Sequence, residues 1–243
     1  MNFKSIIIEY HYLDVPAPFC YTKTLKIKAT DTALQADYLL EYTDREEFSQ
    51  DELEEEGFTG EDNESWKGDL HINWLDTLKS LTDNSVGEKA TSANECIVYV
   101  DGTLLETYGN ESKWDYFIQE ITQAIYETAT WEQPLAIRYC KKESNSDKAP
   151  IKKLQISFAS KSASISPAEK NAKTIQWETI QQLLKLYYLQ EFREDNHSNK
   201  VPNQTGVYTD PSDGLWYDIK GSASALAKVQ REELSNVLEE LFA

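Results

Sequence analysis

Residues 6–42 read IIIEYHYLDVPAPFCYTKTLKIKATDTALQADYLLEY, and apolar and polar side chains alternate through three successive runs of this stretch. Alternation with a period of two places the apolar residues of each run on one face of a β-strand. These residues are Ile6, Ile8, Tyr10 and Tyr12, then Leu25, Ile27 and Ala29, then Leu34, Ala36, Tyr38, Leu40 and Tyr42. Because the connections are short, the stretch predicts an antiparallel meander with one buried and one solvated face.

The same order of patterns occurs twice along the chain. In each half, strand-like runs are followed by a helical pattern, a hairpin and a second helical pattern. In the first half these later elements are expected at 69–81, 96–108 and 113–128, with Asp101-Gly102 as the hairpin turn. Asp-Gly between two apolar runs is a strong hairpin signal. In the second half the strands are expected at 134–140, 154–160 and 162–166, and the later elements at 177–192, 206–219 and 225–242.

Both halves therefore have the order βββαββα, over residues 1–130 and 131–243, and some residues agree as well as the order. The matching residues are Ile72 and Trp74 with Ile175 and Trp177, Val98-Tyr99 with Val207-Tyr208, and Asp101-Gly102 with Asp213-Gly214. We predict an α+β fold of antiparallel meanders with helices on one face, produced by an internal duplication. Two such halves would be related by a pseudo-twofold axis, like a homodimer fused into one monomeric chain.

An acidic segment separates the first meander from its helix. Residues 44–65 read DREEFSQDELEEEGFTGEDNES and hold eleven carboxylates against the single cation Arg45. Thr43 followed by Glu46 has the spacing of a capping box, and Gly57 could end the helix. Only Phe48 and Leu53 offer apolar contacts, so we expect a short, poorly anchored helix and a solvated loop at 57–68. We treat 44–68 as an insertion, because its counterpart SPAEKNAKT (166–174) is not acidic.

The formal net charge of −18 limits the possible partners. Nucleic acids and anionic membrane surfaces attract Lys/Arg-rich proteins, so neither is an expected partner. A basic protein is the electrostatic complement, and opposite charge would speed the encounter. The alternative is that the carboxylates only maintain solubility.

The sequence also suggests a compartment. The N-terminal residues lack the apolar core of a signal peptide, and no run approaches the length of a membrane span. Cys20, Cys96 and Cys140 are odd in number and lie in strand-like runs, which favours reduced thiols packed as small apolar groups. We therefore expect a cytoplasmic protein.

No pattern of catalytic or ligand-binding residues stands out. His11, His71 and His197 are isolated from one another, and the glycine-rich phosphate loops, the G-x-S-x-G motif and the EF-hand pattern are all missing. We predict no catalytic residue, cofactor or metal site. Paired-carboxylate glycosidase chemistry stays open, because acidic residues are too numerous to mark a position.

The leading hypothesis is a non-catalytic, acidic protein-binding module that engages a basic protein. Trp66 adjoins the acidic run and, like Trp131 and Trp216, is expected in a loop, where an aromatic has less reason to pack. The predicted partner-binding residues are Asp51, Glu52, Glu54, Glu55, Glu56 and Trp66. In charge and fold class the chain is similar to small acidic inhibitors such as bacterial toxin-immunity proteins. Two alternatives remain: a small-molecule or hydrolytic site in a cleft between the halves, and a structural pseudo-dimer.

Overall fold

The computed structural model describes residues 3–13, 15–59, 62–83, 94–105, 111–143, 149–167, 175–189, 197–220 and 225–242. The chain divides into two compact units. Unit 1 comprises Met1–Glu132 and Phe158–Ser160, and unit 2 comprises Gln133–Ser157 and Lys161–Ala243. Among the described residues, no helix has the length and apolar character needed to cross a membrane.

Unit 1 contains a six-stranded antiparallel sheet in the order β4-β3-β2-β1-β5-β6. Its strands are β1 Ser5–Tyr12, β2 Tyr21–Ala29, β3 Ala33–Tyr42, β4 Glu64–His71, β5 Glu95–Val100 and β6 Thr103–Leu105. The register places Ile6 opposite Ile27 and Ile27 opposite Ala36, so the apolar side chains of the first three strands share one face. The predicted meander is confirmed.

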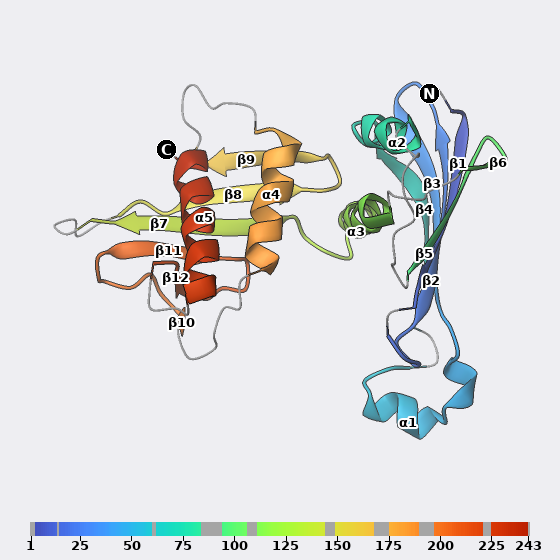
Figure 1. Ribbon diagram of the computed structural model, residues 1–243, viewed down its shortest axis with the longest axis horizontal. Coiled ribbons are helices and arrows are strands. Elements are labelled where there is room, and N and C mark those ends of the chain that lie inside the picture. Colours follow the sequence, from blue (N-terminus) through green and yellow to red (C-terminus); the bar gives the residue numbers. More distant parts are fainter. Residues whose placement is uncertain are drawn as a thin grey trace. The chain divides into compact units, whose positions relative to one another are not determined.

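Helices α2 (Trp74–Asp83) and α3 (Glu111–Thr128) cover that apolar face of the unit 1 sheet (Figure 1). Their buried residues recur every three or four positions, which is the spacing of one helix face. On α3 these are Trp114, Phe117, Ile118, Ile121, Ala124 and Ile125, and on α2 they include Trp74, Leu78 and Leu81. The ring of Phe117 contacts those of both Trp74 and Trp114 in edge-to-face geometry, which joins the two helices above the sheet.

Unit 2 also contains a six-stranded antiparallel sheet, in the order β10-β12-β11-β7-β8-β9. The strands are β7 Leu135–Lys142, β8 Lys152–Ser157, β9 Ser162–Ser166, β10 His197–Ser198, β11 Gly206–Asp210 and β12 Trp216–Asp218. Helices α4 (Trp177–Tyr188) and α5 (Ala225–Leu241) lie on one face of it (Figure 1). On the other face a second cluster of Cys140, Tyr208 and Trp216 is covered by Ala149 and Val201.

The two sheets share a five-strand arrangement. The order β3-β2-β1-β5-β6 in unit 1 corresponds strand for strand to β9-β8-β7-β11-β12 in unit 2. Each unit adds one strand at a different edge, β4 beside β3 and β10 beside β12. Trp74 begins α2 in unit 1, and Trp177 begins α4 in unit 2. The α+β fold is therefore confirmed, and the two sheets are consistent with two similar halves. The predicted βββαββα order is incomplete, because unit 1 also contains α1 and β4 and unit 2 also contains β10.

The Asp101-Gly102 turn forms as predicted. Val100 pairs with Thr103 across it, and both turn residues have positive φ, 48° for Asp101 and 81° for Gly102. These are the angles of a type I′ turn, which matches the twist of the flanking strands. The Asp101 carboxylate accepts hydrogen bonds from the backbone N–H groups of Lys4 and Ser5, so the turn also holds the start of β1.

The loop expected at 57–68 and the helix expected from residue 69 are partly wrong, because Glu64–His71 forms strand β4. Trp66, Gly68 and Leu70 pair with Tyr38, Ala36 and Leu34 of β3, and the long β3 thereby gains a second partner. Leu70 belongs to this strand, and the helix begins at Trp74. Residues 64–71 have only two apolar side chains on the inner face, Trp66 and Leu70, with Gly68 between them. This pattern is too weak to identify a strand from the sequence.

Further differences are smaller. The two-residue strand β10 was not predicted, and Trp216 lies in strand β12 instead of a loop. Helix α4 ends at Tyr188, short of the expected residue 192, and residues 190–192 lie outside the described part of the chain. Strand β6 ends at Leu105, and the expected strand residues 106–108 are also outside it.

In unit 2, a bridging carboxylate ties α5 to the sheet. Glu239 accepts hydrogen bonds from Lys141 Nζ on β7 (2.7 Å) and from Lys220 Nζ (2.8 Å). These bonds to Lys141 and Lys220 lower the pKa of Glu239 to about 2. The carboxylate side chain is 28% exposed, while the two lysines are about half exposed, so solvent weakens each pair.

We predict that Glu239→Gln lowers the stability of unit 2 by about 1 kcal/mol at neutral pH. Because the folded pKa lies below the ordinary value of 4.5, this contribution is present above about pH 4.5 and is lost as the pH falls toward 2. Hydrogen exchange of the α5 amides, measured between about pH 6 and pH 3, should show the parent and the variant converging. Glu240→Gln, at an exposed neighbour, is the control. The prediction would be contradicted if the α5 exchange rates of the parent and of Glu239→Gln differed by the same factor at every pH in this range.

Candidate functional site

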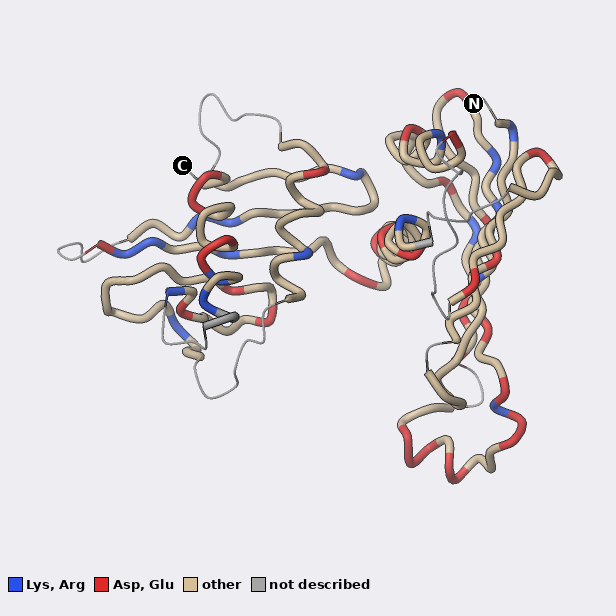
Figure 2. The backbone as a smooth tube through the Cα atoms, viewed as in Figure 1, with Lys and Arg blue, Asp and Glu red and all other residues tan. Residues whose placement is uncertain are grey.

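The described residues 44–59 and 62–63, which connect β3 to β4, form a separate structure that we call the acidic lobe. It extends beyond one end of the unit 1 sheet and carries the short helix α1, Gln50–Glu55 (Figure 1). Asp and Glu occupy half of its described positions, and these positions follow one another closely along its backbone (Figure 2). The lobe is thus a distinct, strongly negative projection of unit 1.

The lobe helix begins at a different residue from the one expected. Thr43 does not cap the helix. Its backbone N–H donates to the carbonyl oxygen of Cys20, so Thr43 continues the pairing of the sheet. Asp44 then adopts the left-handed conformation, with φ 60°, and a 3-10 turn follows at Arg45–Glu47. The capping box forms instead at Ser49, whose backbone N–H donates to Glu52 Oε2 at 2.8 Å while its Oγ accepts from Glu52 N.

The guanidinium of Arg45 latches the lobe onto the meander. It lies over two aromatic rings, 3.6 Å from the centroid of Tyr42 and 4.1 Å from that of Phe58. Its Nε donates to Pro18 O at 3.1 Å, and its Nη1 donates to Asp62 Oδ2 at 2.7 Å. The Arg45 side chain is only 13% exposed. Stacking and charge-assisted hydrogen bonds therefore hold both ends of the lobe against the sheet.

Apolar contacts add to this latch. Gly57 has φ 84°, and after it the N–H of Phe58 returns to Leu53 O at 2.8 Å, which closes the helix end. Leu53 is buried, and the Phe58 ring meets Phe19 at 5.2 Å between centroids. The expectation of a poorly anchored helix is wrong. Leu53 anchors the helix from within, and Arg45, Phe19 and Phe58 add contacts from outside it.

The carboxylates of the lobe point to solvent. The exposed ones are Asp44, Glu46, Glu47, Asp51, Glu52, Glu54, Glu55 and Glu56, which include every carboxylate of the predicted partner-binding set. Hydrogen bonds from Ser49 lower the pKa of Glu52. The last turn of α1 holds no basic residue, so Glu54, Glu55 and Glu56 lie near the negative end of the helix dipole without a cation of the helix beside them. Their placement does not serve helix stability.

Trp66 lies on strand β4 and not in a loop. It is opposite Tyr38, on the face that the helices cover. Its ring lies directly over Gly68, and a Cβ atom at position 68 would be only 2.4 Å from Cζ2 of Trp66. It remains partly exposed. Trp131 does lie in a turn, after α3, and is 49% exposed. The structure thus gathers the predicted carboxylates on one lobe and places Trp66 on the sheet.

A buried polar network beneath α3 was missed. Lys23 on β2 is only 9% exposed and donates to Thr122 Oγ1 on α3 at 3.2 Å. Burial lowers its pKa to about 8, and the negative charge of Glu64 opposes that shift. Glu64 Oε2 accepts from Tyr126 at 2.6 Å and from Tyr38 at 3.4 Å. The sequence did contain a sign that Lys23 is buried. It lies two residues before Leu25 and four before Ile27, and therefore on the apolar face of the same strand.

The remaining candidate residues have structural surroundings. His11 Nδ1 and Thr22 Oγ1 lie 3.0 Å apart, and His71 Nδ1 accepts from Asn73 N at 3.2 Å. The three cysteines are free and buried, as expected. Within the described ranges, no group of three His, Cys, Asp or Glu residues has metal-binding geometry. Comparisons of the chain with protein-family models, curated proteins and solved structures find no match.

We predict that Arg45→Ala releases the lobe without unfolding the sheet. The change removes two ring contacts and the hydrogen bonds to Pro18 and Asp62, together about 2–3 kcal/mol of local stability. Amide hydrogen exchange of residues 49–58 should become about 10- to 100-fold faster, while that of β1 and β2 stays unchanged.

Lys67→Ala is the control for a lost surface ion pair. Lys67 pairs with Asp37 at 2.8 Å, but the two side chains are 77% and 41% exposed. Loss of this ion pair should change the free energy of opening, measured by hydrogen exchange, by a few tenths of a kcal/mol at most. If Arg45→Ala behaved like Lys67→Ala, Arg45 would not be the latch.

Proposed function

We propose that this chain is a non-catalytic binding protein whose acidic lobe engages a basic surface of a partner protein. One observation carries the proposal. The exposed carboxylates of the lobe stand on an ordered projection, while the lobe's single cation, Arg45, is turned inward against Tyr42 and Phe58. The outward side of the lobe is therefore negative, with no described basic side chain to neutralise it.

The order of the lobe supports this proposal. A disordered acidic segment loses conformational freedom when it binds, whereas a lobe held by Arg45, the Ser49 capping box and buried Leu53 has already lost it. Fixed carboxylates can match fixed Lys and Arg side chains, and such pairs set the association rate and the orientation of the complex. The uncompensated charge of Glu54, Glu55 and Glu56 at the end of α1 is explained if a partner's cations meet it.

Trp66 is the aromatic residue that we expect to contact the partner. Aromatic residues are enriched where protein interfaces bury most surface, and Trp66 is partly exposed on edge strand β4, which continues from the lobe. Its contact with Gly68 gives it a packing role as well. The carboxylates of α1 are therefore the primary test, and Trp66→Leu is a secondary one.

We predict that replacing Glu52, Glu54, Glu55 and Glu56 together by Gln abolishes capture of the partner. Gln at position 52 can still accept from Ser49 N, so the capping box and the lobe should survive. The measurement is affinity capture from the source organism's lysate at about 50 and 500 mM salt, because exposed charges are strongly screened at the higher salt. The captured protein should be basic, be released at high salt, and then bind the purified chain directly.

The matched control places the same four changes elsewhere. Glu95, Glu178, Glu232 and Glu240 are exposed and lie outside the lobe, so their replacement by Gln gives an equal net charge. This control should retain the partner. Equal loss in both variants would show that net charge alone attracts the protein, and equal retention in both would show that the lobe is not the binding surface.

A further inference from the structure

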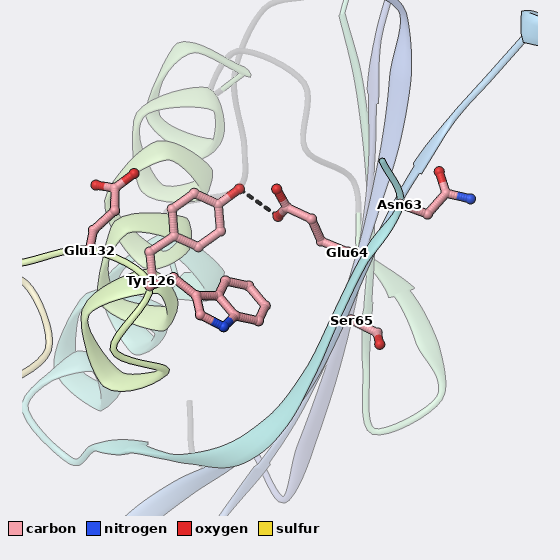
Figure 3. A pocket seen from close by; sticks show the side chains of 6 residues that line it. Asn63, Glu64, Ser65, Tyr126 and Glu132 are labelled. Carbon is pink, nitrogen blue, oxygen red and sulfur yellow. Dashed lines mark hydrogen bonds between the residues drawn. The ribbon is translucent and has the colours of Figure 1, made fainter. Parts of the chain in front are cut away.

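A pocket of about 540 Å³ lies within unit 1, between the start of strand β4 and the end of helix α3. Its lining residues are Asn63, Glu64, Ser65, Tyr126, Trp131 and Glu132. Figure 3 shows Glu64 pointing toward Tyr126, while the side chains of Asn63 and Ser65 lie on the other side of the strand. The pocket is therefore formed by four side chains and by the backbone of β4.

Two of these side chains are carboxylates, and no lining residue is basic. Glu64 uses Oε2 to accept from the hydroxyls of Tyr126 and Tyr38, so Oε1 has no hydrogen-bond partner among the described residues. Glu132 accepts from the neutral amide of Gln123 at 2.7 Å, which leaves its charge uncompensated by that contact. Lys23 also interacts electrostatically with Glu64, but its ammonium is buried against Thr122.

The other two side chains are aromatic. The rings of Tyr126 and Trp131 are 5.6 Å apart between centroids and inclined at 53°. Trp131 is 49% exposed, so a large part of its indole is open to a ligand. Aromatic faces carry a negative electrostatic potential, which attracts ammonium and guanidinium groups.

The end of α3 adds a third source of negative potential. Beyond Thr128 the chain turns at Thr130, with φ 61°, and the carbonyl of Tyr126 accepts from the N–H groups of both Trp131 and Glu132. This turn places both residues at the C-terminal end of an 18-residue helix whose last turn holds no basic residue. The negative end of the helix dipole favours a cation at this position.

We propose that this pocket binds an organic cation, a primary ammonium or a guanidinium group, against the rings of Tyr126 and Trp131 and between Glu64 and Glu132. The rings, the carboxylates and the helix end all favour positive charge, and the lining lacks a cation of its own. Such a group can belong to a free alkylamine or to a Lys or Arg side chain of another protein. The proposed cation contacts involve none of the lobe's carboxylates, so either proposal can fail without the other.

The test uses the full chain labelled with ¹⁵N and follows the indole N–H signal of Trp131. That signal is assigned by its disappearance in Trp131→Leu. The probes are n-butylammonium and methylguanidinium, with 1-butanol as a neutral analogue of similar length. We expect saturable shifts with at least one cation and none with 1-butanol. Equal shifts with 1-butanol would overturn the proposal, and so would the lack of saturable shifts with both cations.

Variants then separate the contributions. Trp131→Leu, monitored through the backbone N–H signal of Glu132, should weaken cation binding about 2- to 5-fold, the size expected for a partly exposed ring contact. Glu64→Gln should weaken it about 3- to 10-fold, because a charge-assisted contact is lost. Glu54→Gln, on the acidic lobe, should leave it unchanged. Circular dichroism confirms that each variant is folded, and unchanged binding in both pocket variants would overturn the proposal.

A last comparison identifies the source of the cation. Nα-acetyl-lysine methylamide and Nα-acetyl-arginine methylamide present the same groups as protein side chains. Tighter binding of a blocked amino acid than of the corresponding simple cation assigns the pocket to a protein side chain, through contacts of its backbone with β4. Tighter binding of the simple cations assigns it to a small amine. Either result supports the cation site itself.

Discussion

The architecture of each unit depends on pairing both edges of its first strand. In unit 1 the residues of β1 pair with β2 through the meander, and Ile6, Ile8 and Tyr10 pair with β5 on the other side. Because β5 is far along the chain, α2 must cross the sheet before β5 can reach that edge, and α3 follows to cover the rest of the apolar face. In unit 2, β7 lies between β8 and β11 in the same way. This constraint therefore accounts for the order of the five strands that the two sheets share.

Patterns within single elements predicted most of this fold. Alternation identified the meanders, Asp101-Gly102 identified its hairpin, and helical spacing identified α3 and α5. What failed depends on contacts between distant residues. Strand β4 pairs with the edge of β3, and the run Trp66-Lys67-Gly68-Asp69-Leu70 alternates but has a glycine in place of a third apolar side chain. The anchor of the acidic lobe likewise depends on Arg45 reaching Pro18 and Tyr42, which a local pattern does not contain.

The two candidate sites differ in the same way: one follows from a local pattern, and the other depends on contacts between distant residues. The carboxylates of α1 were predictable, because exposed charge is a property of composition and needs no partner. The pocket at the end of α3 was not, since Glu64 and Tyr126 are 62 positions apart and meet only when β4 joins the sheet. Trp131 was recognised as an aromatic in a loop, but its neighbours could not be named. Lys23 could have been recognised, because a lysine in register with Leu25 and Ile27 must be buried or must interrupt the strand.

The negative charge of unit 1 is of two physical kinds. On the lobe the carboxylates are exposed and numerous, so each is screened by solvent and salt, and only their sum over a basic surface can produce useful attraction. In the pocket the carboxylates are few, but two aromatic rings and a helix end lie beside them and favour the same positive charge. The first arrangement suits a broad protein surface and the second a single cationic group. The lobe and the pocket both border β4, at its start, and a basic protein that docks on the lobe could present one Lys or Arg to the pocket.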